Sequence, residues 1–143
     1  MPVTSEIPAE LIAAYRATTY RVESAELIID LVIDQFNHEL AVLHLQHRVN
    51  SSAFITAFNP YSIQTSRNAN TTAHEALVRH IDSMHLPWLG GVGVGTDPNW
   101  SPERSVLVLG ISFEQVNTLA HLYRQNAFIF CDESAVPTLH LCR

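Results

Sequence analysis

Polar side chains follow an apolar run in the first half of the chain, and their types suit the binding of a small polar molecule. The run at 53–58 contains one hydroxyl, that of Thr56, and it is followed by Asn59, Tyr61 and Ser62. Together these side chains offer both donors and acceptors of hydrogen bonds. In open α/β sheets ligands bind where buried strands end, beside loops and helix N-termini. We therefore expect a ligand site here; the alternative is a turn whose side chains bond to their own backbone.

Two further polar clusters could complete this site. Trp100 and Glu103 precede the next apolar run, and Glu103 is adjacent to Arg104. Glu103 is the one candidate for a catalytic group, as a general base, and the guanidinium could hold an anion. The alternative is a solvated ion pair at the start of a strand. Gln125 and Asn126 follow a predicted helix, where they either join the site or end the helix.

Other catalytic signatures are weak or missing. All eight cationic residues are arginine, so Schiff-base enzymes and phosphate-loop nucleotidases are excluded. The glycines at 90–95 lack the spacing of a dinucleotide fingerprint, and no Gly-x-Ser-x-Gly elbow occurs. His44 and His47 have the spacing of two metal ligands on one helix, but no third ligand is evident. We predict no metal site and no cofactor.

Composition restricts the class of protein further. With 47% hydrophobic and 15% charged residues, the 143-residue chain is globular rather than disordered or fibrous. Its net charge of −6 repels phosphate and anionic lipid, so we expect neither a nucleic-acid nor a membrane partner. No apolar stretch is long enough for a membrane helix, and no signal-peptide pattern is present. We expect Cys131 and Cys142 to be free thiols. We expect a cytoplasmic protein.

The residue pattern predicts an alternation of helices and strands. Residues 23–36 fit a helix by spacing, but their Ile and Val content and a helix cap at Asn37 favour a strand followed by a helix. The predicted elements are a helix at 7–15, strands at 18–22 and 27–33, a helix from 37 to 47, a strand at 53–58, a helix at 66–84, strands at 86–95 and 105–111, a helix at 113–125, and a hairpin of 127–131 and 136–142.

This order predicts a single α/β domain over residues 1–143. Two buried strands lead directly into helices, which is typical of parallel pairing, whereas the terminal strand pairs read as hairpins. We therefore expect a mixed central sheet with parallel core strands, antiparallel edge hairpins and helices on its faces.

The stretch Ala-Phe-Ile-Thr-Ala-Phe-Asn-Pro-Tyr-Ser at 53–62 resembles a bacterial family called domain of unknown function 3293. The resemblance extends over residues 15–141. Its other matching positions are Asn70, Gly93, Trp100, Glu103, Ser105, Gln125, Asn126 and Ala127. The family usually has Trp at the position of Phe58 and a second acid at that of Arg104, which argues against a paired-carboxylate mechanism here. The resemblance implies a bacterial cytosolic protein and joins the three polar clusters into one pattern, but it brings no established activity.

Three functional hypotheses follow. The leading one is binding of a small polar or nucleotide-like ligand at the ends of the buried strands, by Thr56, Asn59, Tyr61, Ser62, Asn70, Trp100, Glu103, Gln125 and Asn126. The second is a non-catalytic protein-interaction module that docks through a sheet edge or the helix at 7–15. The third is a metal-independent hydrolase or transferase with Glu103 or a histidine as base.

Overall fold

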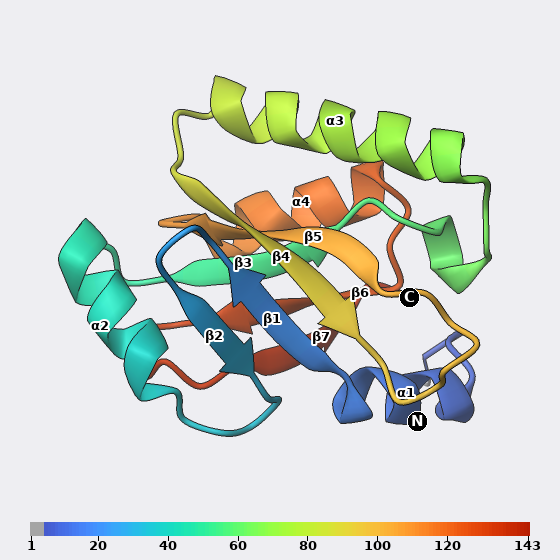
Figure 1. Ribbon diagram of the computed structural model, residues 1–143, viewed down its shortest axis with the longest axis horizontal. Helices are drawn as coiled ribbons and strands as arrows, with labels where there is room; N and C mark the ends of the chain where they lie inside the picture. Colours follow the sequence, from blue (N-terminus) through green and yellow to red (C-terminus); the bar gives the residue numbers. More distant parts are fainter. Residues whose placement is uncertain (1–4) are drawn as a thin grey trace.

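A seven-stranded sheet forms the centre of the computed structural model, which describes residues 5–143 (Figure 1). The strand order is β2-β1-β4-β5-β3-β6-β7, and each neighbouring pair is antiparallel. Residues 1–4 of the predicted domain lie outside the described residues. None of the helices within 5–143 is long and apolar enough to cross a membrane.

The order of helices and strands is the predicted one, with a single short 3-10 helix added. The elements are α1 (Ala9–Ala17), β1 (Thr19–Glu23), β2 (Ile28–Leu31), α2 (His38–His47), β3 (Ser52–Thr56), η1 (Pro60–Ser62), α3 (Arg67–Ser83), β4 (Trp88–Val94), β5 (Glu103–Leu109), α4 (Phe113–Leu122), β6 (Ala127–Cys131) and β7 (Thr138–Leu141). The choice of a strand followed by a helix for residues 23–47 is confirmed by β2 and α2.

Side-chain caps fix where three of the helices begin. Asn37 accepts a hydrogen bond from the N–H of Leu40 at the start of α2, at 2.9 Å. Ser66 caps α3 in the same way. Ser112 and Gln115 form a reciprocal capping box at the start of α4. These caps satisfy backbone donors that the first turn of a helix leaves free, so local sequence alone determines these boundaries.

The prediction of parallel core strands is wrong. The chain runs from β3 through α3 to β4, and β3 and β4 do point the same way, but β5 lies between them and is antiparallel to both. In the same manner β3 separates β5 from β6. The helices α3 and α4 therefore each connect two strands that point the same way, as in a parallel crossover. In both cases one antiparallel strand lies between the two connected strands, as in split β-α-β units. The hairpins β1–β2 and β6–β7 form the two edges.

Strands β3 and β5 are covered on both faces, which explains their nearly continuous apolar sequence. Alternate residues of β5 point to opposite sides, so that Leu107 and Leu109 belong to one core and Val106 and Val108 to another. The core that contains Leu107 and Leu109 lies on the concave face of the sheet, and we call it the concave-face core. It includes side chains from both halves of the sheet and from α2, among them Val22, Leu31, Leu40, Phe54 and Ile129. The helix-face core packs the sheet against α3 and α4, through residues that include Ile55, Leu77, Ile81, Val116 and Leu119. The sheet curls around the concave-face core, and α1 closes one end of this face (Figure 1).

Gly91 permits the closest approach within the concave face. A Cβ atom at this position would lie 2.7 Å from the carbonyl oxygen of Arg21 and 2.7 Å from the Phe54 ring. Only glycine therefore fits at this position without displacing its neighbours. At Gly90, whose side of the strand is the opposite one, the nearest atom would be 3.6 Å away.

Gly91→Ala should therefore destabilise the protein by about 1–3 kcal/mol, because the added methyl group overpacks the core. Chemical denaturation measures the loss. Gly90→Ala, in the same strand, has room for the methyl group and serves as the control. An equal loss in both variants would mean that strand backbone effects, rather than contact with Phe54, decide the outcome.

Candidate functional site

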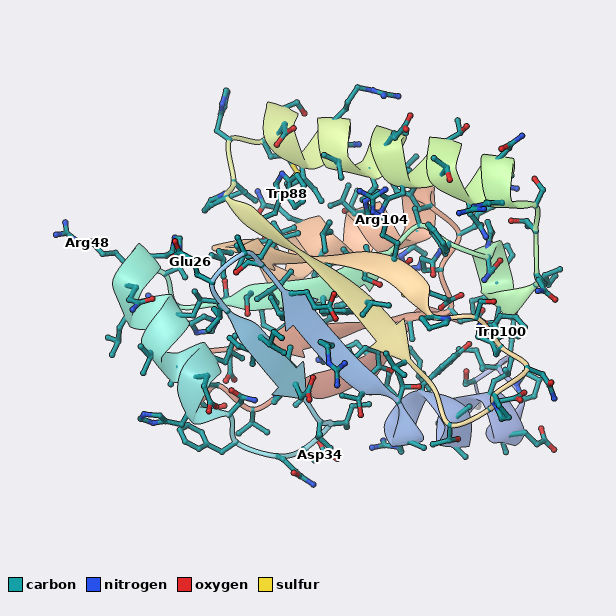
Figure 2. All side chains as sticks on the ribbon, viewed as in Figure 1. Glu26, Asp34, Arg48, Trp88, Trp100 and Arg104 are labelled. Carbon is teal, nitrogen blue, oxygen red and sulfur yellow. The ribbon has the colours of Figure 1, made fainter. Side chains whose placement is uncertain are left out.

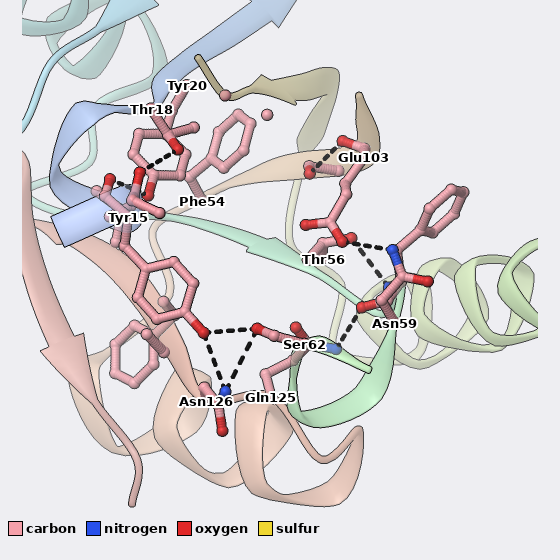
Figure 3. Close-up of a pocket in the computed structure, with 18 of the residues that line it drawn as sticks. Tyr15, Thr18, Tyr20, Phe54, Thr56, Asn59, Ser62, Glu103, Gln125 and Asn126 are labelled. Atoms are coloured by element: carbon pink, nitrogen blue, oxygen red, sulfur yellow. Dashed lines mark hydrogen bonds between the residues drawn. The ribbon is translucent and has the colours of Figure 1, made fainter. Parts of the chain in front are cut away.

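The three predicted polar clusters meet at one cavity at the end of the concave face. Thr56 ends β3 and pairs with Ser105 near the start of β5, so antiparallel pairing brings these two ends together. The cavity has a volume of about 230 Å³, which is below the roughly 300–1,000 Å³ of typical ligand pockets. The predicted site residues that line it are Trp100 and the six labelled in Figure 3, namely Thr56, Asn59, Ser62, Glu103, Gln125 and Asn126. Tyr61 and Asn70 do not line it.

Asn59 connects the loop after β3 to the start of β5 and to α3. Its side-chain Nδ2 donates to Glu103 Oε2 at 2.7 Å, and its backbone N–H donates to Asn70 Oδ1 at 2.8 Å. Its Oδ1 accepts from the N–H of Thr65 and from Asn70 Nδ2. Asn70 is buried and touches no ligand space, so it is a positioning residue that holds Asn59 rather than a member of the cavity wall.

Backbone strain is concentrated in the same loop. Asn59, Tyr61 and Ser62 have φ values of 48°, 56° and 59°, in the left-handed region. Asparagine tolerates this region, but for tyrosine and serine it is uncommon, and such strain persists only where surrounding contacts enforce it. Turn-forming bonds of the polar side chains do occur here, so the turn and the ligand interpretations of residues 59–62 are not exclusive. Strain of this kind clusters at functional sites.

Glu103 is the less exposed of the two acidic residues that line the cavity. Burial is the main influence on its carboxyl group and raises its pKa above the usual range, while hydrogen bonds from Asn59 and Trp100 act in the opposite direction. Its backbone carbonyl accepts from Ser105 Oγ at 2.9 Å, which fixes the first residues of β5. Thr56 Oγ1 donates to the neighbouring carbonyl of Arg104 and accepts from the N–H of Phe58.

A second polar corner joins α1 to the end of α4. The hydroxyls of Tyr15 and Ser62 are 2.5 Å apart, and Asn126 Nδ2 donates to both (Figure 3). Asn126 Oδ1 in turn accepts from Arg143 at 3.3 Å. Gln125 donates through Nε2 to the carbonyl of Phe58, which ties it to the strained loop. Gln125 and Asn126 thus do more than end a helix.

Aromatic and apolar side chains from the N-terminal part of the chain complete the cavity, and the sequence analysis did not place them there. Tyr15 and Leu11 come from α1 and Tyr20 from β1, beside Phe54. The rings of Tyr20 and Phe54 meet edge to face, with centroids 5.4 Å apart. The available signal is the apolar face of the helix at 7–15, which covers the cavity.

Arg104 and Tyr61 lie outside the cavity. Arg104 follows Glu103 in β5 and points to the opposite face, near Trp88 and α3 (Figure 2). There it lines a shallow cleft with His74, whose Nδ1 is the only buried side-chain N or O atom in residues 5–143 that has no hydrogen-bond partner. The Tyr61 ring is half-exposed, and the guanidinium carbon of Arg143 lies 4.3 Å from its centroid.

The histidine pair does not form a shared site. His44 is buried and bonds through Nε2 to Ser52 Oγ at 2.8 Å, whereas His47 is exposed. Within residues 5–143 no group of three or more His, Cys, Asp or Glu side chains could hold a metal ion.

Replacement of Asn70 tests how the loop is held. Asn70→Ala should lower stability by about 2 kcal/mol, because it leaves the buried N–H of Asn59 without an acceptor. Denaturant unfolding measures this, with Asn68→Ala, an exposed asparagine of the same helix, as control. Equal stability of the two variants would show that Asn70 does not support the loop.

Comparison with known proteins identifies a family and no individual relative. A family model described as a protein of unknown function (DUF3293) matches residues 55–128. The match runs from β3 into β6 and includes every residue predicted for the site. No curated protein and no solved structure matches the chain. Because the matched segment is just over half of its length, the chain belongs to the DUF3293 family, whose function is unknown.

Proposed function

We propose that the protein binds a small molecule in the cavity lined by Thr56, Asn59, Trp100, Glu103 and Asn126. The observation that carries this proposal is the convergence of polar groups on one cavity from segments as far apart as Tyr15 and Asn126, which are separated by 111 positions. A cavity with apolar walls and a few placed polar groups is the usual form of a small-molecule site.

The strained loop supports the same proposal. Left-handed backbone at Tyr61 and Ser62 costs free energy, and it places the Ser62 hydroxyl in the cavity wall beside Tyr15. The conformation therefore favours a role for this loop in binding.

The positions of the aromatic side chains favour a small ligand over a protein partner. Trp100 lines the cavity instead of an exposed face. Trp88 donates its indole N–H to Asp82 at 2.8 Å, and the Tyr61 ring lies against Arg143. Protein interfaces depend on aromatic anchors that the free surface presents, and these three rings are already engaged.

Acid–base catalysis on the bound molecule is a second candidate function. The observation that favours it is the placement of Glu103, whose pKa burial raises, in the wall of a cavity that could hold substrate. An acid shifted in this direction is suited to proton transfer closer to neutral pH. Turnover that is lost in Glu103→Gln while binding persists would separate this function from simple binding.

We place this function in the bacterial cytoplasm. The support is the resemblance to a bacterial family, together with Cys131 and Cys142, which are free thiols.

Amide NMR with a library of small fragments tests the cavity. Fragments that bind should shift resonances of residues lining it, and Gly93→Leu should abolish these shifts because the new side chain enters the cavity near Thr18. Gly90→Leu places the same side chain on the other face of β4 and should leave binding intact. Shifts that persist in Gly93→Leu, or that lie elsewhere on the molecule, would contradict the proposed site.

The cost of keeping Glu103 buried gives a prediction about pH. A raised pKa means that the Glu103 carboxyl group holds its proton more readily in the folded state than in the unfolded state, where its pKa has the ordinary value of 4.5. The resulting stability is complete below that pH and is lost as the pH rises through the raised pKa. Above this window Glu103→Gln should therefore be more stable than the wild type, a gain that should shrink in acid.

Unfolding at a series of pH values measures this difference. Glu26→Gln removes the same charge from an exposed position and is the control. A loss of stability in Glu103→Gln at neutral pH would show that the carboxylate is a structural asset instead.

A further inference from the structure

We propose that the ligand is a cation, with an amine, amidine or guanidinium group that binds Glu103 and an apolar body that fills the cavity. This inference rests on the proposed function, because it names the ligand class of the same cavity.

The charges that line the cavity have one sign. Asp97 and Glu103 contribute carboxylates, and the described lining residues include no lysine, arginine or histidine. A phosphate or carboxylate ligand would therefore meet repulsion without any compensating cation. These charges disfavour ligands that carry phosphate, including the nucleotides among the ligands suggested by the sequence. Neutral and cationic molecules are compatible with them.

Glu103 has no cationic partner within the described chain. Its side chain accepts a hydrogen bond from the neutral amide of Asn59, and the other neighbour that affects its pKa, Trp100, is neutral as well. Ion pairs in residues 5–143 join Arg16 to Asp34, Arg21 to Asp30, and Arg143 to Glu6. Arg104, although adjacent in sequence, points to the opposite face of the sheet.

A partly buried carboxylate without a counter-ion is unfavourable, and a ligand cation can supply the missing charge. Transfer of an ionised acid out of water is costly unless the acid is paired with an opposite charge. A ligand cation at Glu103 would form charge-assisted hydrogen bonds, which are stronger than neutral ones. The other available response, protonation of Glu103, would leave no preference for a charged ligand, and the experiment below distinguishes the two.

The walls of the cavity suit a cation attached to an apolar group. Trp100 contacts the Glu103 side chain, and the Phe54, Phe58 and Tyr20 rings line the remaining space. Aromatic faces attract cations, and the same rings bury an apolar body. The second polar corner, at Tyr15, Ser62 and Asn126, offers neutral groups to the far end of such a molecule.

Three ligands of one shape and different charge test this inference. Benzylamine, benzyl alcohol and benzoate share a ring and differ in the attached group, which is cationic, neutral or anionic near neutral pH. Titration followed by amide NMR gives the three dissociation constants. We expect benzylamine to bind at least about tenfold more tightly than benzyl alcohol, the difference between a charged and a neutral hydrogen bond, and benzoate to bind most weakly.

Two variants assign the preference to Glu103. Glu103→Gln keeps the shape and an acceptor for Asn59 but removes the charge, so it should bind benzylamine no more tightly than benzyl alcohol. Glu26→Gln, which lies at the opposite end of the sheet from Trp100 (Figure 2), should retain the full preference. The amide spectrum of each variant reports whether it is folded.

The outcomes separate this inference from the proposed function. Equal affinity of the wild type for benzylamine and benzyl alcohol, or a preference that survives in Glu103→Gln, would overturn the cationic ligand and leave the cavity as a binding site. Failure of all three molecules to shift the resonances of cavity residues in folded protein would overturn both.

Discussion

The hydrogen bonds of Asn59 join the loop after β3 to α3 and to the first residue of β5. Its N–H and Oδ1 face Asn70, and its Nδ2 reaches Glu103. The left-handed backbone at Asn59 is what directs the main chain and the side chain toward different partners at once. Because Glu103 and Ser62 are both placed through this loop, the shape of the cavity depends on a small cluster of amide contacts, while the cores of the sheet supply the rigid frame around it.

Local structure could be predicted from the sequence because its signals are local. Asn37, Ser66 and Ser112 cap helices through contacts with residues only three positions away, and such contacts can be recognised without the rest of the fold. Strand pairing has no comparable signal. The continuous apolar character of 105–111 indicates that this strand is covered on both faces, which is correct. A central antiparallel strand with a core on each face is, however, buried as completely as a parallel one, so burial does not reveal the direction of pairing. Nothing near β3 or β4 specifies that β5 will occupy the gap between them.

The candidate site was predicted in part for the same reason. Thr56 and Asn59 follow β3 and Glu103 begins β5, so polar groups at strand ends could be expected from the sequence. Their meeting depends on the antiparallel pairing of these strands, because parallel strands would have placed Thr56 and Glu103 at opposite edges of the sheet. Asn70 and Tyr61 have the right residue types but were assigned to the ligand, since no sequence pattern separates a residue that lines a cavity from one that holds a neighbour in place. The contributions of Tyr15 and Tyr20 depend on where α1 packs, which is a tertiary fact. The positive φ angle of Tyr61 likewise could not be predicted from the sequence, because tyrosine rarely adopts the left-handed conformation.

The interlocked arrangement of β3, β4, β5 and β6 has a kinetic consequence. β3 cannot pair with β5 until α3 and β4, which lie between them in the sequence, have been synthesised. β5 then occupies the position between β3 and β4. The bond from Ser51 Oγ to the carbonyl of Ile111 spans 60 positions, and such closures are slow because long loops must be ordered before their contacts form. The centre of this sheet can therefore assemble only late, from a chain that is nearly complete, and a nascent polypeptide emerging from the ribosome would expose the apolar β3 until β5 arrives.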